Sequence, residues 1–309
     1  MAGDVTARGV VGFVGLGNMG IPMSRRLVAA GYQVRGFDTS AAAIRDFAGI
    51  ADSEAGGGVI AVAELASVGD GADAVILMLP DSDVVEHVLL SAGLLAALPA
   101  GSTVIDMSSS DPARTRVLAE RTAAAGVTLI DAPVSGGVAG ARAGTLAVMV
   151  GGPAAAFERF APMLSAIGAR VLHAGDAGAG HAVKALNNLM SAANLLLASE
   201  ALIAGQRFGL DPAVMLEIIN VSSGRSASTE NKWPNYVLTG KYDAGFTIRL
   251  MIKDIRLALG IEHATGVQAV VSEAVVAGWE AALADLPPES DHTAIARWLA
   301  EREAKDSPG

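Results

Sequence analysis

The sequence contains no cysteine and few aromatic residues, and each shortage excludes a class of structure. Without cysteine there are no disulfides, no thiol nucleophile and no thiolate metal site. Aromatic residues make up 4% of the 309 residues and hydrophobic residues 51%, so alanine, valine, leucine and isoleucine must form the core. Such a core suits helices packed closely on each other or on a buried parallel sheet. Because 309 residues is long for one domain, we expect two.

Basic tracts and long apolar runs are also missing. The formal net charge is -10, which disfavours nucleic acid or an anionic membrane as a partner. The N-terminus lacks the basic region, apolar run and cleavage site of a signal peptide. No stretch approaches the roughly 20 apolar residues that cross a bilayer. We therefore expect a cytoplasmic protein that contacts neither nucleic acid nor a membrane.

Short apolar runs alternate with helix signals through the first half of the chain. Strands are predicted at Val10–Val14, Gln33–Phe37, Ala74–Leu79, Thr103–Met107, Thr128–Ala132, Leu146–Val150 and Ala169–His173. This alternation is typical of an α/β domain with a parallel sheet. From His181 to Phe208 there is no proline and one glycine, which leaves room for a helix of about 27 residues.

Only helix signals follow that long helix. Asp211 and Pro212 mark one helix start, and further helices are predicted at Phe246–Gly260, Thr265–Leu286 and Asp291–Glu303. We predict a Rossmann-type α/β domain over residues 1–178 and an all-α domain over residues 179–309, joined by the long helix.

A glycine-rich turn follows the first predicted strand. Gly15, Gly17 and Gly20 have the GxGxxG spacing, and Pro22 lies in the first turn of the next helix. Gly15 permits a tight turn, Gly17 leaves room for a pyrophosphate, and Gly20 lets the helix pack on the strand. The alternative is a purely structural β–α turn. The preceding strand, the following helix and an acid at the right distance favour dinucleotide binding.

That acid is Asp38, at the end of the second strand. Its carboxylate is suited to accept hydrogen bonds from the adenosine ribose and would repel a 2′-phosphate. Thr39 and Ser40 follow it, and Arg45 is more simply explained as part of a solvated helix face. We therefore favour NAD as the cofactor, with NADP possible.

Further candidate cofactor contacts lie at the carboxyl ends of two later strands, where ligands bind in open α/β sheets. Ser108 and Ser109 are candidates, although serines there also suit helix N-capping. The full set of expected cofactor contacts is Gly15, Leu16, Gly17, Asn18, Met19, Gly20, Asp38, Met78, Leu79, Pro80, Ser109 and Lys253.

A second glycine-containing loop, Ser135-Gly136-Gly137, follows the strand Thr128–Ala132. Such a loop can offer several backbone N–H groups and a serine hydroxyl to an anion. A flexible turn is an equally good interpretation of these residues alone.

Lys184, Asn187 and Asn188 lie near the start of the long helix, within the stretch GAGHAVKALNN at 178–188. Their three- and four-residue spacing places the three side chains on nearly one face. Oxidation of an alcohol needs a base for the hydroxyl proton. The sequence has no cysteine and no histidine-rich cluster to hold a catalytic zinc, so we predict that Lys184 is this group. A solvated or snorkelling lysine is the alternative.

Four blocks make the chain resemble the beta-hydroxyacid dehydrogenase family, whose type case is 3-hydroxyisobutyrate dehydrogenase. They are GFVGLGNMGIPMSRRL at 12–27, DAPVSGGVAGARAGTLAVMVGG at 131–152, GAGHAVKALNN at 178–188 and FTIRLMIKDIRLAL at 246–259. The resemblance implies a Rossmann-type domain and an all-helical domain joined by a long helix.

The resemblance also implies roles for individual residues. Lys184 is implied as the catalytic acid/base and Asn188 as the residue that helps hold the substrate, with Asn187 beside it. Ser135, Gly136 and Gly137 are implied to bind the substrate carboxylate. Lys253, with Asp254 beside it, is implied to close the cleft over substrate and cofactor.

The function expected from these blocks is hydride transfer between a short-chain beta-hydroxy acid and NAD(P), giving a semialdehyde or keto acid. The alternatives are a reductase of tartronate, succinic or glyoxylate-type aldehydes using NADPH, and a non-catalytic nucleotide-binding module. An imine reductase is disfavoured, since such enzymes generally replace the lysine. The segment 224–236 does not predict a substrate. For Asn231 and Trp233 a position facing the cleft is one interpretation, and surface or interface packing is the better one. We expect a homodimer or homotetramer.

Overall fold

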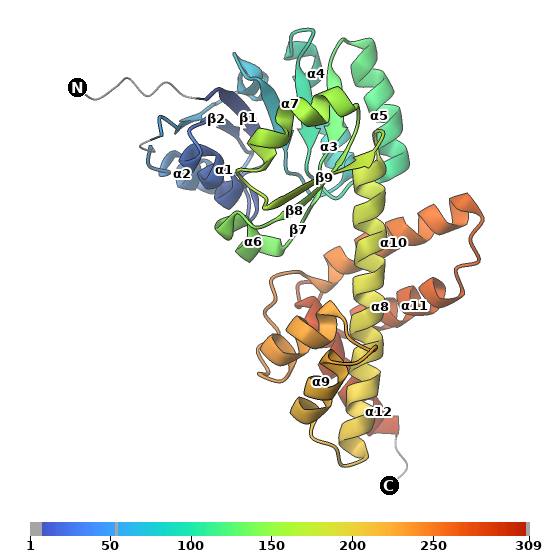
Figure 1. The fold of residues 1–309 in the computed structure, drawn as a ribbon. Coiled ribbons are helices and arrows are strands. Elements are labelled where there is room, and N and C mark those ends of the chain that lie inside the picture. Colours follow the sequence, from blue (N-terminus) through green and yellow to red (C-terminus); the bar gives the residue numbers. More distant parts are fainter. Residues whose placement is uncertain (1–7, 53–54, 307–309) are drawn as a thin grey trace. The chain divides into compact units, whose positions relative to one another are not determined.

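A computed structural model describes residues 8–52 and 55–306, and the chain divides into two compact units, Met1–Lys184 and Ala185–Gly309 (Figure 1). One helix, α8 (Ala179–Arg207), belongs to both units. The domain boundary after residue 178, suggested by the sequence, stays a prediction.

Unit 1 is built on a nine-stranded sheet with the order β3-β2-β1-β4-β5-β6-β8-β7, and β9 also pairs with β8. The six strands from β3 to β6 are parallel, and β8 is antiparallel to β6. The strands are β1 (Val10–Val14), β2 (Gln33–Phe37), β3 (Gly58–Ala61), β4 (Ala74–Leu77), β5 (Thr103–Asp106), β6 (Thr128–Asp131), β7 (Val134–Ser135), β8 (Ala147–Gly151) and β9 (Arg170–Gly175). The predicted α/β fold is confirmed.

Helices connect these strands, and each face of the sheet has its own apolar cluster. Phe13 of β1 belongs to one cluster and the next residue, Val14, to the other, because successive side chains of a strand point to opposite faces. The helices of unit 1 before α8 are α1 (Gly20–Ala29), α2 (Ala41–Ala48), η1 (Leu65–Gly69), α3 (Ser82–Glu86), η2 (His87–Ser91), α4 (Leu94–Ala97), α5 (Pro112–Ala124), α6 (Gly137–Ala143) and α7 (Ala154–Leu164).

One helix of this unit changes type along its length, and one interpretation of the sequence needs correction. The helix that begins at Ser82 is α-helical only to Glu86 and continues as the π-helix η2. The serines after β5 do not cap the next helix: the N-cap of α5 is Asp111, whose carboxylate accepts hydrogen bonds from two backbone N–H groups. An aspartate followed by proline is a strong helix start. Asp111 therefore occupies the N-cap position for which the serines had been considered.

Among the described residues, unit 2 consists of helices, as predicted. They are the main part of α8, followed by α9 (Pro212–Asn220), the π-helix η3 (Ser228–Val237), α10 (Ile248–Thr265), α11 (Val270–Asp285), η4 (His292–Ala294) and α12 (Ile295–Asp306). The fully buried Trp279 anchors the core, and its indole N–H donates to the carbonyl of Ala192 on α8 at 3.3 Å.

The length and composition of α8 would allow it to cross a membrane. The expectation that no stretch approaches the length of an apolar membrane span was therefore wrong for this helix. The core helix of a soluble protein passes the same test. Within unit 2, Leu189, Ala192, Leu195 and Leu202 of α8 belong to the apolar core. They give the helix one buried face, as expected of the central helix of a globular unit.

The start of α10 is held by the carboxylate of Asp291. Its Oδ2 accepts hydrogen bonds from the backbone N–H groups of Gly245 and Phe246, and its Oδ1 accepts one from the N–H of Thr293. Burial alone would raise the pKa of Asp291, but hydrogen bonds from His292 and Thr293 outweigh it and hold this pKa well below its ordinary value.

The depressed pKa of Asp291 predicts an acid-sensitive unit 2. The ionised form stabilises the fold above the ordinary aspartate pKa, near 3.8, and this stability is lost as the pH falls towards the folded-state value. Asp291→Asn should lower the free energy of unfolding at pH 7 and flatten its dependence on pH below 5. Urea unfolding between pH 3 and pH 7 measures both effects. A variant whose acid dependence matched the parent protein would contradict this assignment.

Candidate active site

A cavity of about 420 Å³ opens at the carboxyl ends of the first parallel strands of unit 1. It lies between β1 and β4, where the strand order of the sheet reverses, which is the usual ligand position in this architecture. Its lining residues are Val14, Gly15, Gly17, Asn18, Met19, Gly20, Phe37, Asp38, Thr39, Met78, Leu79, Pro80, Val84 and Val88. The predicted cofactor residues of the glycine-rich turn and of the β4 end therefore line one cavity, apart from Leu16, which is buried.

The glycines of this turn serve different purposes. Gly15 has φ +96°, and a Cβ there would lie 2.2 Å from the carbonyl oxygen of Met78, so only glycine fits. At Gly17, by contrast, a Cβ would meet nothing within 4 Å. The open space beside Gly17 matches what a pyrophosphate needs, and the residues present therefore fit a dinucleotide.

Asp38 both lines this cavity and fixes the turn. Its Oδ2 accepts a hydrogen bond of 2.7 Å from the N–H of Leu16, and its Oδ1 accepts one of 2.7 Å from the N–H of Ser40. Each carboxylate oxygen has a second lone pair, so these bonds leave capacity for a ribose hydroxyl. One side chain thus shapes the loop and presents negative charge to the cavity.

The opposite wall, formed by Met78, Leu79 and Pro80, is tied to the end of β5. The N–H of Leu79 donates to the hydroxyl of buried Ser108 at 3.0 Å. Ser109 is half-buried beside it. Ser108 therefore supports the wall from behind, a role that the sequence did not indicate.

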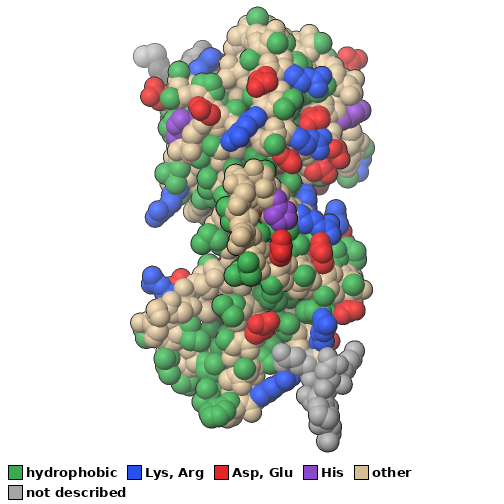
Figure 2. All heavy atoms as spheres, turned by 90° about the vertical axis from the view of Figure 1, so that its right-hand side faces the viewer, with side chains coloured by type: hydrophobic (Ala, Val, Ile, Leu, Met, Phe, Trp, Pro, Cys, Tyr) green, Lys and Arg blue, Asp and Glu red, His purple; other side chains and the backbone are tan. Residues whose placement is uncertain are grey.

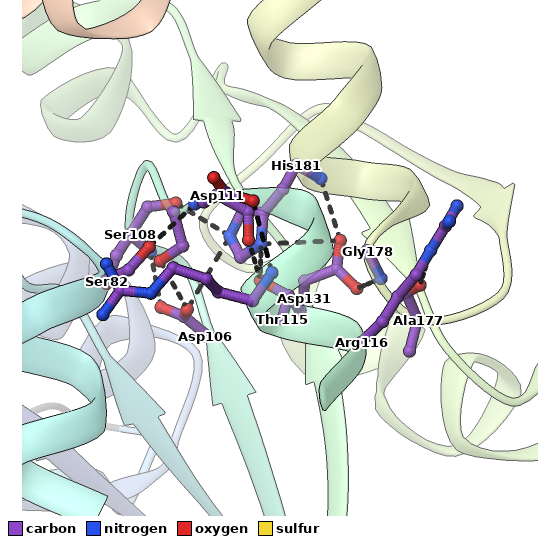
Figure 3. Close-up of polar contacts among 12 residues, drawn as sticks. Ser82, Asp106, Ser108, Asp111, Thr115, Arg116, Asp131, Ala177, Gly178 and His181 are labelled. Carbon is purple, nitrogen blue, oxygen red and sulfur yellow. Dashed lines mark hydrogen bonds and ion pairs between the residues drawn. The ribbon is translucent and has the colours of Figure 1, made fainter. Parts of the chain in front are cut away.

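The start of α8 is anchored by a buried polar network at the ends of β5 and β6 (Figure 3). Asp131 is fully buried, and its two carboxylate oxygens accept hydrogen bonds from the N–H groups of Gly178 (2.7 Å) and His181 (2.8 Å). The His181 ring lies between Asp131 and Asp106, at 3.8 Å from an oxygen of each. Sequence reasoning overlooked this network because its contacts with the start of α8 join residues 47 to 75 positions apart.

Further bonds of the same ring fix its orientation. Nε2 lies 3.1 Å from the carbonyl oxygen of Ser108, which can only accept, so Nε2 carries hydrogen and donates. Nδ1 lies 2.9 Å from the hydroxyl of Thr115 on α5. Lys184 follows His181 by three residues on α8, so the network determines where the turn bearing Lys184 begins.

The candidate carboxylate loop follows β7. Gly136 and Gly137 have φ values of +130° and +61°, and both are exposed, whereas Ser135 at the strand end is half-buried. Two successive residues in a conformation that side chains disfavour support glycine at both positions. The exposed backbone at both glycines is compatible with the expected anion site, since no side chain covers it.

In unit 2, a short chain of polar contacts joins α8 to α10. The side-chain nitrogen of Asn188 donates to Oδ2 of Asp254 at 2.6 Å, and Oδ1 of Asp254 lies 3.5 Å from the ammonium of Lys253. Both Asn188 and Asp254 are buried, and Asn187 is exposed beside them, with its nitrogen 3.3 Å from Oδ1 of Asn188. Because a carboxylate only accepts, Asp254 fixes which end of the Asn188 amide faces it.

Comparison with known proteins agrees with this geometry. Residues 10–175 match the family model described as the NAD binding domain of 6-phosphogluconate dehydrogenase. Residues 178–299 match the model described as NAD-binding of NADP-dependent 3-hydroxyisobutyrate dehydrogenase. The chain belongs to the beta-hydroxyacid dehydrogenase family.

Several members of this family are similar over most of their length. The chain is 42% identical to 2-(hydroxymethyl)glutarate dehydrogenase of Eubacterium barkeri over 81% of each chain. It is 42% identical to 3-hydroxyisobutyrate dehydrogenase of Pseudomonas aeruginosa over 84% of this chain and 86% of that one. A solved structure of Mycobacterium tuberculosis 3-hydroxyisobutyrate dehydrogenase with L-serine has a TM-score of 0.84 and 33% identity, covering 94% of this chain and 99% of that one.

As a beta-hydroxyacid dehydrogenase, the protein is an NAD(P)-dependent oxidoreductase that acts on hydroxy acids. The lining of the unit 1 cavity is consistent with the NAD-binding match, which covers β1 to β9.

The contrast between Gly15 and Gly17 gives a test of the cofactor cavity. Gly17→Ala should leave the thermal midpoint unchanged, because the added methyl group meets no protein atom, yet it should weaken NADH binding about tenfold or more by entering the pyrophosphate space. Gly15→Ala should instead lower the thermal midpoint, since its methyl group would meet the Met78 carbonyl. NADH fluorescence titration and thermal unfolding measure the two effects. Unchanged NADH affinity in Gly17→Ala would show that the cofactor does not lie against this turn.

Proposed function

We propose that this enzyme oxidises the primary alcohol of a 3-hydroxypropionate substituted at C2, giving the corresponding semialdehyde. The substituent is a methyl group in 3-hydroxyisobutyrate, an ammonium group in L-serine and a carboxyethyl group in 2-(hydroxymethyl)glutarate. These are the molecules in the names of the similar proteins, and all three contain the unit HOCH₂–CH–COO⁻.

The observation that carries the proposal is the polar face at the start of α8. Lys184 and Asn188 lie one helical turn apart, and Asn188 is fixed by its 2.6 Å hydrogen bond to Asp254. A half-buried lysine beside an oriented amide is what an alcohol needs at its reacting hydroxyl.

In this proposal the substrate carboxylate binds to Ser135 and to the backbone N–H groups at Gly136 and Gly137. The hydroxyl lies within hydrogen-bond reach of Lys184. Asn188 offers its second amide N–H to the substrate oxygen, because the first already donates to Asp254. Asn187 and Lys253 bind the substrate, and Lys253 also contacts the cofactor.

A bound nicotinamide supplies the hydride acceptor. The contribution of the chain is to hold the alcohol and to move its proton. In the oxidative direction Lys184 takes the hydroxyl proton, and in the reductive direction it returns a proton to the alkoxide oxygen.

Lys184→Ala should lower turnover by about 10²- to 10⁴-fold, the usual contribution of a positioned acid/base group. NADH affinity should stay close to that of the parent protein, because Lys184 does not line the cofactor cavity. Stopped-flow turnover and NADH fluorescence titration measure the two quantities. Lys241→Ala, which removes an exposed lysine of unit 2, is the control. Loss of NADH affinity with turnover retained would assign Lys184 to the cofactor instead.

We further propose that NAD is preferred over NADP. The support is Asp38, whose carboxylate lines the cavity at the position where a 2′-phosphate would bring two more negative charges. kcat/KM should be about 10- to 100-fold higher with NAD than with NADP, in line with the cost of placing like charges side by side. Initial rates with each cofactor at saturating hydroxy acid measure this ratio. Equal values would refute the inference from Asp38.

We also propose that the protein is a homodimer or homotetramer. The support is apolar surface on unit 2, where hydrophobic side chains lie exposed with few charges between them (Figure 2). Met190 and Leu197, seven residues apart on α8, are 67% and 66% exposed, and Phe208 just after it is 85% exposed. Such side chains commonly mark an interface. Light scattering that gave the mass of one chain would contradict this proposal.

We also propose that the enzyme is soluble and cytoplasmic. It is supported by the core position of α8 and by the metabolic dehydrogenases among the similar proteins. Recovery of the intact protein in the membrane fraction of cells would argue against it.

A further inference from the structure

Lysine is rare in this chain, and its distribution is uneven. The sequence has seventeen arginines but only five lysines, at positions 184, 232, 241, 253 and 305. The proposed function uses Lys184 and Lys253. Lys232 lies on η3, in the segment 224–236 from which the sequence predicted no substrate.

The ammonium of Lys232 is held against the polar face of α8. It donates a hydrogen bond of 2.8 Å to the hydroxyl of Ser191. Ser191 follows Asn188 by three residues and Lys184 by seven, so all three side chains leave α8 on nearly the same face. The rise of a helix places Ser191 about 10 Å beyond Lys184 along the axis.

The residues before and after Lys232 make their hydrogen bonds away from the polar face of α8. Trp233 is buried, with its indole N–H 3.3 Å from the hydroxyl of Ser199. Asn231 is exposed and accepts a hydrogen bond from Asn235 at 2.7 Å. Of these three consecutive residues, Lys232 is the one held at the polar face of α8. Its half-buried position limits how far the ammonium can move.

We propose that Lys232 determines substrate specificity by binding an anionic group at the far end of the C2 substituent. The preferred substrate is then a dicarboxylic 3-hydroxy acid of the 2-(hydroxymethyl)glutarate type. This proposal rests on the proposed function, which places the reacting hydroxyl at Lys184. The bond to Ser191 holds a cation at this face of α8, and a carboxylate is the natural partner of an ammonium.

The dimensions of such a substrate agree with the spacing along α8. Six covalent bonds of about 1.5 Å separate the hydroxyl oxygen from an oxygen of the distal carboxylate, and the extended chain spans about 7 Å. A hydrogen bond of about 2.9 Å at each end brings the reach to about 13 Å. This reach covers the helical rise between Lys184 and Ser191. A methyl substituent, as in 3-hydroxyisobutyrate, is too short to reach Lys232.

The test compares 2-(hydroxymethyl)glutarate with 3-hydroxyisobutyrate at saturating cofactor. Lys232→Met keeps the length of the side chain and removes the charge. It should lower kcat/KM for the dicarboxylate about 10- to 100-fold, mainly through KM, as expected for the loss of a charge-assisted hydrogen bond. The value for 3-hydroxyisobutyrate should stay within about threefold. Lys241→Met is the matched control and should alter neither substrate.

Ser191→Ala should produce a smaller loss with the same selectivity, because it frees the ammonium without removing it. Equal losses for both substrates in Lys232→Met, or no loss for either, would overturn the role of Lys232. A parent enzyme that prefers the monocarboxylate would overturn it as well.

Binding of a molecule that cannot react separates this proposal from the proposed function. The dicarboxylate 2-methylglutarate lacks the hydroxyl, and its affinity for the NADH-loaded protein is measured by calorimetry beside that of isobutyrate. The parent protein should bind 2-methylglutarate more tightly, and Lys232→Met should remove the difference. If no hydroxy acid is oxidised but this contrast is seen, the proposed function fails and the role of Lys232 stands. If oxidation proceeds without the contrast, the role of Lys232 fails alone.

Discussion

The geometry at the start of α8 depends on the carboxylate of Asp131. This side chain ends β6 in the interior of unit 1 and satisfies two N–H groups of the turn that leads into the helix. Both N–H groups are buried with it, and leaving either one unpaired would cost about 1–3 kcal/mol. Space is equally tight, since a Cβ on Gly180 would lie 2.2 Å from the carbonyl oxygen of Met149. The helix that carries Lys184 is therefore tied directly to the sheet that carries the cofactor cavity.

Much of the fold followed from patterns that are local in sequence. β1 and β2 were predicted to the residue, because each is a short apolar or alternating run bounded by glycine and aspartate. The strand β3 was overlooked, since its four residues include an exposed Ile60 at the sheet edge and lack a buried apolar run. The π-helical segments were also overlooked, because a π-turn differs from an α-turn in hydrogen bonding and not in apolar period.

In the candidate site, too, features that are local in sequence could be predicted and long-range contacts could not. The glycine-rich turn and Asp38 could be found because their spacing reflects one loop and one strand. The partners of Asn188 and of His181 could not, since Asp254 and Asp106 lie 66 and 75 positions away and pair through tertiary structure. Lys232 illustrates the same limit. Its neighbours Asn231 and Trp233 drew attention as polar and aromatic residues, whereas only the fold shows which of the three contacts α8.

Asp38 links two properties that are usually discussed separately. The carboxylate that, in our proposal, disfavours a 2′-phosphate also accepts the N–H of Leu16 in the middle of the glycine-rich turn. A single substitution that removes the charge by removing the side chain would also release the turn. An evolutionary or engineered change towards NADP therefore requires a neutral residue that still accepts this bond, together with a new cation for the phosphate. Under the proposed preference for NAD, a single substitution at Asp38 would therefore not be enough to change the cofactor to NADP.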